Sequence, residues 1–396
     1  MQRSIVPLQT TRNMILRRCF RSTTTRQFNA TATRTRPNTK PSLQDVFPPI
    51  QFVPIWETHY PNHGGKLEND ALDTATKHVI AMIQRLYRRS YFPIPSFVTR
   101  EWCHHLLQQL GESSASDRSN FVPWAHMQRA KVLLEAMQLT SELDTRSMPF
   151  ELPRPNGKTY RLVLEVYART EPPPTDNNNN LLVAHQARDL VLRMEADYRA
   201  TADLTLRPTV VEWNRVLETY AQAQHDDRAT YAVQVLLEHV MTATDGRSLS
   251  FVDTTSLLLA FRACMYRVPS PQAATKGAVA AAKLWERLVD DPSAHHLWLQ
   301  CKSHVYSHFM QAIRHLPPSD QRERLFAQAM EQARRYGKVN DVIVNEFIVH
   351  AKPMSMVQSI LGKERLQAVK GLPPQQAAQQ LVASLPASWS QHQDSN

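Results

Sequence analysis

Apolar side chains recur every three or four positions over most of this chain, which is the spacing that places them on one face of an α-helix. The pattern is clearest between residues 208 and 241. Its first half presents a face made of Val210, Trp213, Leu217 and Tyr220. A polar turn follows, and the second half presents Tyr231, Val235, Leu236, Val240 and Met241. The stretch is therefore predicted to form two amphipathic helices joined by a short turn.

The same helical pair recurs along the chain. A matching first helix lies 53 residues upstream, where Tyr160, Leu164 and Tyr167 stand for Trp213, Leu217 and Tyr220. Weaker copies of the first helix carry Leu258 and Phe261; Tyr306, Met310 and Ile313; Val344, Asn345, Ile348 and Ala351. Copies of the second helix carry Ala130, Leu133 and Met137; Ala187, Leu190 and Met194; Ala281, Leu284 and Leu288. Alternation of two helix types predicts an all-α solenoid of helix-turn-helix repeats, with an irregular helical bundle as the alternative.

Changes in composition divide the chain into four predicted parts. Residues 71–362 are expected to form the array, with about five or six helical pairs. Residues 45–70 are rich in proline and aromatic side chains, so we expect an irregular arm that covers the first repeat. Residues 363–396 are expected to be a disordered or weakly helical tail. The chain has no apolar run of eighteen residues, so no membrane span is expected.

Residues 1–44 differ from the remainder in charge. They contain nine basic residues, many Ser and Thr, and no acidic residue. This composition is typical of an organellar transit peptide, with the mitochondrial matrix as the expected destination, a plastid as the second choice and a disordered basic tail as the alternative. The whole chain has 46 basic and 36 acidic residues, so the remainder has 37 against 36. Any nucleic-acid surface on the array must therefore come from local clustering of cations.

Sites for catalysis or cofactors are not evident in the sequence. The four cysteines show no Cys-x-x-Cys spacing, and the nine glycines form no phosphate-binding loop. Cys301, His304 and His308 have spacing that would suit three zinc ligands, but polar surface with one packed cysteine is the preferred interpretation. We therefore expect no cofactor, no metal, no small-molecule ligand and no enzymatic activity.

One repeat resembles a known family. Pro208, the pair Trp213-Asn214, Leu217, the pair Tyr220-Ala221 and the closing Met241 are similar to a pentatricopeptide repeat. The resemblance covers about residues 150 to 350. It implies a right-handed α-solenoid, import into an organelle, and binding of single-stranded RNA with roughly one base read by each repeat.

The resemblance also implies which side chains would meet RNA. The family reads a base with the residue two positions after the aromatic, which here gives Leu162, Arg215, Ser256, His308 and Glu346. Only Ser256 is of the type usual in the family, and Arg215 suits a phosphate better than a base edge. A basic cluster near the start of the array, which is either a solvated face or a phosphate contact, adds Arg85, Arg88 and Arg89.

Two functions compete. The first is a non-catalytic protein that binds single-stranded organellar RNA and acts in mitochondrial RNA processing, stability or translation. The alternative is a protein–protein scaffold, similar to tetratricopeptide repeats, or an accessory subunit of a mitochondrial assembly. The charge of the exposed face separates them, because a basic face favours RNA and a mixed or apolar face favours a protein ligand. An enzyme, the third possibility, would need a buried cluster of carboxylates or histidines.

Overall fold

The computed structural model describes residues 72, 75–77, 79–80, 100–112, 124–141, 154–170, 180–240, 252–265 and 270–390. The chain divides into two units, residues 1–61 and 62–396, and the described residues all belong to the second. The predicted transit peptide at 1–44 and arm at 45–70 lie outside the described residues. The same holds for Arg85, Arg88 and Arg89.

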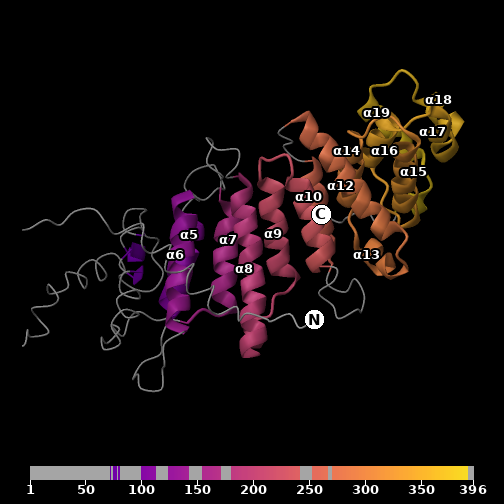
Figure 1. Ribbon diagram of the computed structural model, residues 1–396. Coiled ribbons are helices and arrows are strands. Elements are labelled where there is room, and N and C mark those ends of the chain that lie inside the picture. The colour runs from indigo at the N-terminus through magenta and orange to yellow at the C-terminus, as the bar shows by residue number, and fades with distance from the viewer. Residues whose placement is uncertain are drawn as a thin grey trace, which may run out of the picture. The chain divides into compact units, whose positions relative to one another are not determined.

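The described part of the chain is built from α-helices, with no extended β-strand among them (Figure 1). The prediction of an all-α protein is confirmed. The first helices of successive pairs are α5 (Arg100–Glu112), α7 (Gly157–Arg169), α9 (Val210–Gln222), α11 (Thr254–Met265), α14 (Ser303–Ile313) and α16 (Asp341–His350). The second helices are α6 (Trp124–Ser141), α8 (Asn180–Thr201), α10 (Arg228–Val235) with the π-helical turn η2 (Leu236–Val240), α12 (Pro271–Val289) and α15 (Asp320–Arg335).

Packing follows the order of the chain. Each first helix from α7 to α14 packs against the first helix before it and the first helix after it. Each second helix packs on its own first helix and also on the next one, so that α8 contacts α7 and α9, and α10 contacts α9 and α11 (Figure 1). The short helix α13 (His295–Gln300) and the 3-10 turn η3 (Pro292–Ala294) lie between α12 and α14 in the sequence. Neighbouring pairs therefore bury one another's apolar faces.

The core contains most of the side chains that the periodicity selected, although Val210, Tyr231 and Ile348 are half-buried. Tyr160, Leu217 and Tyr220 have no exposed surface, and Trp213 keeps only 5% of its surface exposed. In α11, however, Phe261 is fully buried whereas Leu258 is half-buried. Phe261 therefore takes the place of Leu217, and the sequence alignment of α11 was shifted by three residues. Leucine is abundant in α11, so its spacing alone does not fix the register.

Helix α12 begins earlier than the sequence suggested. Residues 268–277 contain Ser, Pro and Gly and resemble a loop insertion, yet the helix starts at Pro271 because the Ser270 hydroxyl accepts a hydrogen bond from the Ala273 N–H at 3.0 Å. Gly277 lies inside the helix. A Cβ there would stand 2.4 Å from the carbonyl oxygen of Cys264, so glycine allows α12 to approach α11 closely.

The C-terminal segment is part of the packed structure. Beyond α16 the chain forms α17 (Met354–Leu361), α18 (Lys363–Ala368), α19 (Pro374–Ser384) and the 3-10 turn η4 (Ala387–Trp389). Helix α19 packs on α16 and buries Ala377, Ala378 and Leu381. Residues 363–390 of the segment predicted to be a disordered or weakly helical tail are therefore mostly helical, and α19 is packed against the preceding helices. None of the described helices has the length and apolar character needed to cross a membrane.

Candidate binding face of the first helices

The exposed side of each first helix is the candidate binding surface. An α-helix turns by about 100° per residue, so positions 2, 5, 6, 9, 12 and 13 of a helix share one side. We call these positions on the first helices, α5, α7, α9, α11, α14 and α16, the first-helix face. In α9, five of these six positions are exposed or half-buried, namely Val211, Asn214, Arg215, Glu218 and Gln222, and the sixth is the buried Ala221. The opposite side of α9 buries Trp213, Val216, Leu217 and Tyr220.

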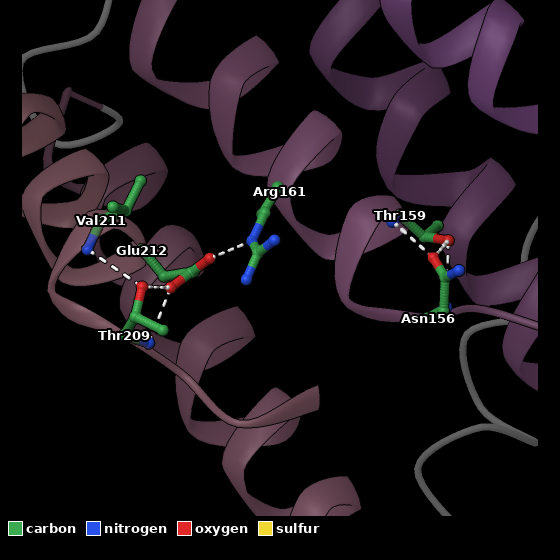
Figure 2. A network of polar contacts seen from close by, with 6 residues as sticks. All are labelled: Asn156, Thr159, Arg161, Thr209, Val211 and Glu212. Atoms are coloured by element: carbon green, nitrogen blue, oxygen red, sulfur yellow. Dashed lines mark hydrogen bonds and ion pairs between the residues drawn. The ribbon is translucent and has the colours of Figure 1, made fainter. Parts of the chain in front are cut away.

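A row of polar contacts joins the first helices at their N-terminal ends. In each case the side chain at position 5 of one helix contacts the side chain at position 3 of the next. The row begins where the His104 Nε2 of α5 lies 2.8 Å from the Thr159 Oγ1 of α7. Thr159 is also held by the N-cap residue, because its backbone N–H donates to the Asn156 Oδ1 at 3.1 Å (Figure 2). The helix cap and the contact between repeats therefore share one side chain.

The next contact in this row is an ion pair. Arg161 at position 5 of α7 points toward α9 and donates to the carboxylate of Glu212, which is fully buried (Figure 2). Glu212 also accepts from the Thr209 backbone N–H at 2.7 Å and from the Thr209 hydroxyl at 2.5 Å. Burial by itself would raise the pKa of Glu212, but the hydrogen bonds from Thr209 and Arg161 outweigh it and hold the pKa below its ordinary value.

The third contact joins the neutral amide of Asn214 to the Ser256 hydroxyl and the Asp253 carboxylate. Asn214 at position 5 of α9 donates to both carboxylate oxygens of Asp253, at 3.1 and 3.2 Å. The hydroxyl of Ser256, at position 3 of α11, lies 2.6 Å from the Asn214 Oδ1 and 2.8 Å from Asp253. We call the three contacts His104–Thr159, Arg161–Glu212 and Asn214–Ser256 the polar row.

The polar row ends at α11. The equivalent side chains at the next two steps are Leu258 with Val305 and Ser307 with Ile343, and neither pair can form a hydrogen bond between its side chains. Aromatic packing takes over here. Phe309 of α14 stacks on Trp285 of α12 with ring centres 4.1 Å apart, and it lies 5.4 Å from the ring of Phe261.

The charge on the first-helix face changes at the same point. On α7, Arg169 pairs with Glu165 at 2.6 Å, and on α9, Arg215 pairs with Glu218 at 2.8 Å. With Arg161 paired to Glu212, the face of α7 and α9 has mixed charge. Between Thr254 and Met265 and between Ser303 and Ile313, by contrast, neither α11 nor α14 contains an acidic residue.

The face of α11 and α14 includes Arg262, His304 and His308. Arg262 of α11 is half-buried, His304 of α14 is exposed, and the His304 and His308 ring centres are 6.3 Å apart. Burial, together with the charges of His304 and Arg262, lowers the pKa of His308 to about 4. Its Nδ1 is buried and has no hydrogen-bond partner. At neutral pH this imidazole is therefore neutral.

One acid lies beyond this region, on α16. Glu346 is 6% exposed, and its Oε1 accepts a hydrogen bond from Gln311 of α14 at 3.3 Å. Its Oε2 lies 3.6 Å from His350 and 4.0 Å from Arg314. The carboxylate is thus surrounded by side chains that can carry positive charge.

The structure places four of the five proposed base-reading residues equivalently. Leu162, Arg215, His308 and Glu346 all occupy position 6 of their helices, on the first-helix face. Ser256 does not. It lies at position 3 of α11, is fully buried and belongs to the polar row, so it is not available to a ligand on this face. Leu259 takes position 6 in α11.

The polar row escaped the sequence analysis, although a signal for it exists. Each of the N-cap residues Asn156, Thr209 and Asp253 is followed three positions later by Thr159, Glu212 or Ser256. This is the spacing of a capping box or a close variant of it. Aligning the repeats on these caps also gives the correct register for α11.

The possible zinc ligands do not form a site. Cys301 is fully buried at the end of α13, and burial raises the pKa of its thiol to about 12. Among the described residues, no three His, Cys, Asp or Glu side chains lie close enough to hold a metal ion.

Comparison with known protein-family models, with curated proteins and with solved structures found no match to this chain.

Proposed function

We propose that the helical pairs form a right-handed α-solenoid that binds single-stranded RNA in the mitochondrial matrix, without catalysis of its own. The nearest-neighbour order of the first and second helices supports the solenoid. The resemblance of residues 208–241 to a pentatricopeptide repeat supports the right-handed twist and the RNA ligand. The basic composition of residues 1–44 supports mitochondrial import, with a plastid as the second choice.

One observation carries the RNA proposal. Each pair from α7 to α14 places an arginine on or beside the first-helix face: Arg161, Arg215, Arg262 and Arg314. A cation recurring at each repeat matches a ligand with a charge recurring along its length, which is the property of a nucleic-acid backbone. The pairs that Arg161, Arg215 and Arg314 form with Glu212, Glu218 and Glu346 reduce this attraction at those positions. Helices α11 and α14 carry no acid between their own first and last residues.

Contact with the backbone fits the face better than base reading. Position 6 carries leucine, arginine, leucine, histidine and glutamate in the successive first helices from α7 to α16, and leucine cannot hydrogen-bond a base edge. We therefore propose RNA binding that depends on charge and on the single-stranded state, with a role in RNA processing, stability or translation.

Ultraviolet crosslinking in cells tests this function. The tagged full chain is expressed, irradiated and purified under denaturing conditions, and bound RNA is radiolabelled with and without RNase. We expect organellar transcripts to be enriched over a tagged matrix protein of similar charge. Recovery of no RNA above that control would rule the function out.

A protein partner is the second candidate, and a specific observation favours it. The arginines of the face on α7 and α9 pair with Glu165, Glu212 and Glu218, so this part of the face carries charges of both signs. Such a mixed surface suits a protein better than a polyanion. Purification from organelles with and without RNase separates the two: a partner that stays bound after RNase supports a scaffold or an accessory subunit of a mitochondrial assembly.

A further inference from the structure

We propose that Arg262, His304 and His308 bind a phosphodiester group of single-stranded RNA, and that the His308 imidazole takes up a proton from solvent as it binds. This inference rests on the proposed RNA-binding function and specifies its site. The site would lie across α11 and α14, where the polar row has ended. At position 6 of α14, His308 would then contact the phosphate backbone and would not read a base.

The geometry brings the three side chains to one side of two adjacent helices. Arg262 is at position 9 of α11, and His304 and His308 are at positions 2 and 6 of α14. Helices α11 and α14 pack directly against each other. The two imidazole rings are 6.3 Å apart, and Arg262 is close enough to His308 for its charge to affect the imidazole. A phosphate oxygen is a strong acceptor for a guanidinium and for imidazole N–H groups.

The surrounding charges leave His308 in a positive environment. Arg262 on α11 and His304 on its own helix both oppose its protonation. From α16, Glu346 and His350 lie at the far end of α14, where Glu346 contacts Gln311 and Arg314. Two charged side chains of α12 pair away from His308: Lys276 with Asp227, the residue before α10, and Glu286 with Arg324 of α15. On α15, Arg322 donates to the carbonyl oxygens of Leu316 and His350.

Proton uptake follows from this arrangement. Without a ligand, burial and the neighbouring positive charges keep the pKa of His308 near 4, so the imidazole is neutral above pH 5. A bound phosphate adds negative charge and raises that pKa. The complex then holds more protons than the free protein, so binding becomes tighter as the pH falls. A carboxylate or polyphosphate ligand would show the same sign, so the binding experiment uses RNA itself.

Fluorescence anisotropy with a 5′-labelled twelve-nucleotide poly(U) RNA tests the site on the full chain. At constant ionic strength, we expect the affinity of the wild type to rise by about tenfold between pH 7.5 and 5.5. His304→Gln combined with His308→Gln should remove most of this rise. Arg262→Gln should weaken binding about three- to tenfold at each pH and should reduce the slope of log affinity against log salt by about 0.7.

Two control variants make the result specific. His296→Gln removes an exposed histidine on α13, and Arg215→Gln removes an arginine of α9 that lies outside the proposed site. Both should keep the pH dependence of the wild type. The basic segment 1–44 contains no histidine and is the same in every variant, so it cannot produce a difference between them. Circular dichroism confirms that each variant is folded.

The outcomes separate this site from the general function. RNA binding whose pH dependence survives in the double histidine variant would overturn the site and leave RNA binding intact. The same conclusion follows if Arg262→Gln binds RNA as the wild type does. If neither poly(U) in solution nor RNA in the cell binds the chain, the proposed function itself fails.

Discussion

Two parts of the series of first helices make their helix–helix contacts with different chemistry. From α5 to α11, hydrogen bonds and an ion pair of the polar row join successive helices, and arginines there pair with glutamates. From α11 to α14, aromatic rings make the contact, and the helices carry no acid. Where polar side chains join the helices, their charges are paired within the protein and attract a ligand less. Where aromatic side chains join the helices, the packing places no requirement on the charge of the exposed face.

The largest effect is expected from removing an aromatic ring between α11 and α14. Phe309→Ala empties a fully buried site between Trp285 and Phe261, so we expect the free energy of unfolding to fall by about 3–5 kcal/mol. Urea denaturation followed by circular dichroism measures it. Phe309→Leu is the matched control and should cost less, because it fills most of the cavity. A loss below about 1 kcal/mol for alanine would mean that aromatic packing does not hold this region together.

The polar row should show its largest effect at its ion pair. Glu212→Ala removes a capping box and leaves Thr209 and Arg161 without their acceptor, so we expect a loss of about 2–3 kcal/mol. Arg161→Ala should also destabilise the protein, because the buried carboxylate loses its cation. A double-mutant cycle measures the coupling between them. Additive losses would show that the two side chains do not stabilise each other.

The stability of the fold should depend on pH through His308 of α14. The pKa of His308 is near 4 in the folded chain and near 6.5 when unfolded, so the unfolded state binds the proton first as the pH falls. The free energy of unfolding should therefore decrease by about 1–2 kcal/mol between pH 6.5 and pH 4 on account of this side chain. His308→Gln should reduce the decrease, as measured by urea midpoints at several pH values. Equal pH dependence in both proteins would contradict this assignment.

The smallest expected effect is at the neutral end of the polar row. Asn214→Ala removes the amide that links Asp253 and Ser256 to α9, and we expect a loss of about 1 kcal/mol. Ser307→Ala is the control at the equivalent position of α14, where the hydroxyl only bonds to its own helix at His304. Equal thermal midpoints for the two variants would indicate that the polar row adds nothing specific between α9 and α11.

Part of this picture follows from the periodicity of the sequence. The spacing of Trp213, Leu217 and Tyr220 gave the helical pair and the buried side chains correctly, because apolar residues must leave water wherever they lie on a helix. The spacing misplaced Ser256, because leucines on several sides of α11 allow more than one register. The cap residues Asp253 and Thr209 would have fixed that register, since a helix start is a single defined position.

The sequence by itself determined that this is an all-α chain of alternating helices, with the identity of most core residues. Only the tertiary structure decided which polar side chains pair across repeats. Arg161 and Glu212 are 51 positions apart, and hydrogen bonding between them depends on how two separate helices align. Only the tertiary structure, too, showed that arginines of the first-helix face on α7 and α9 pair with glutamates. Charge on a face depends on which groups are near one another in space, and local periodicity carries no information about such distances.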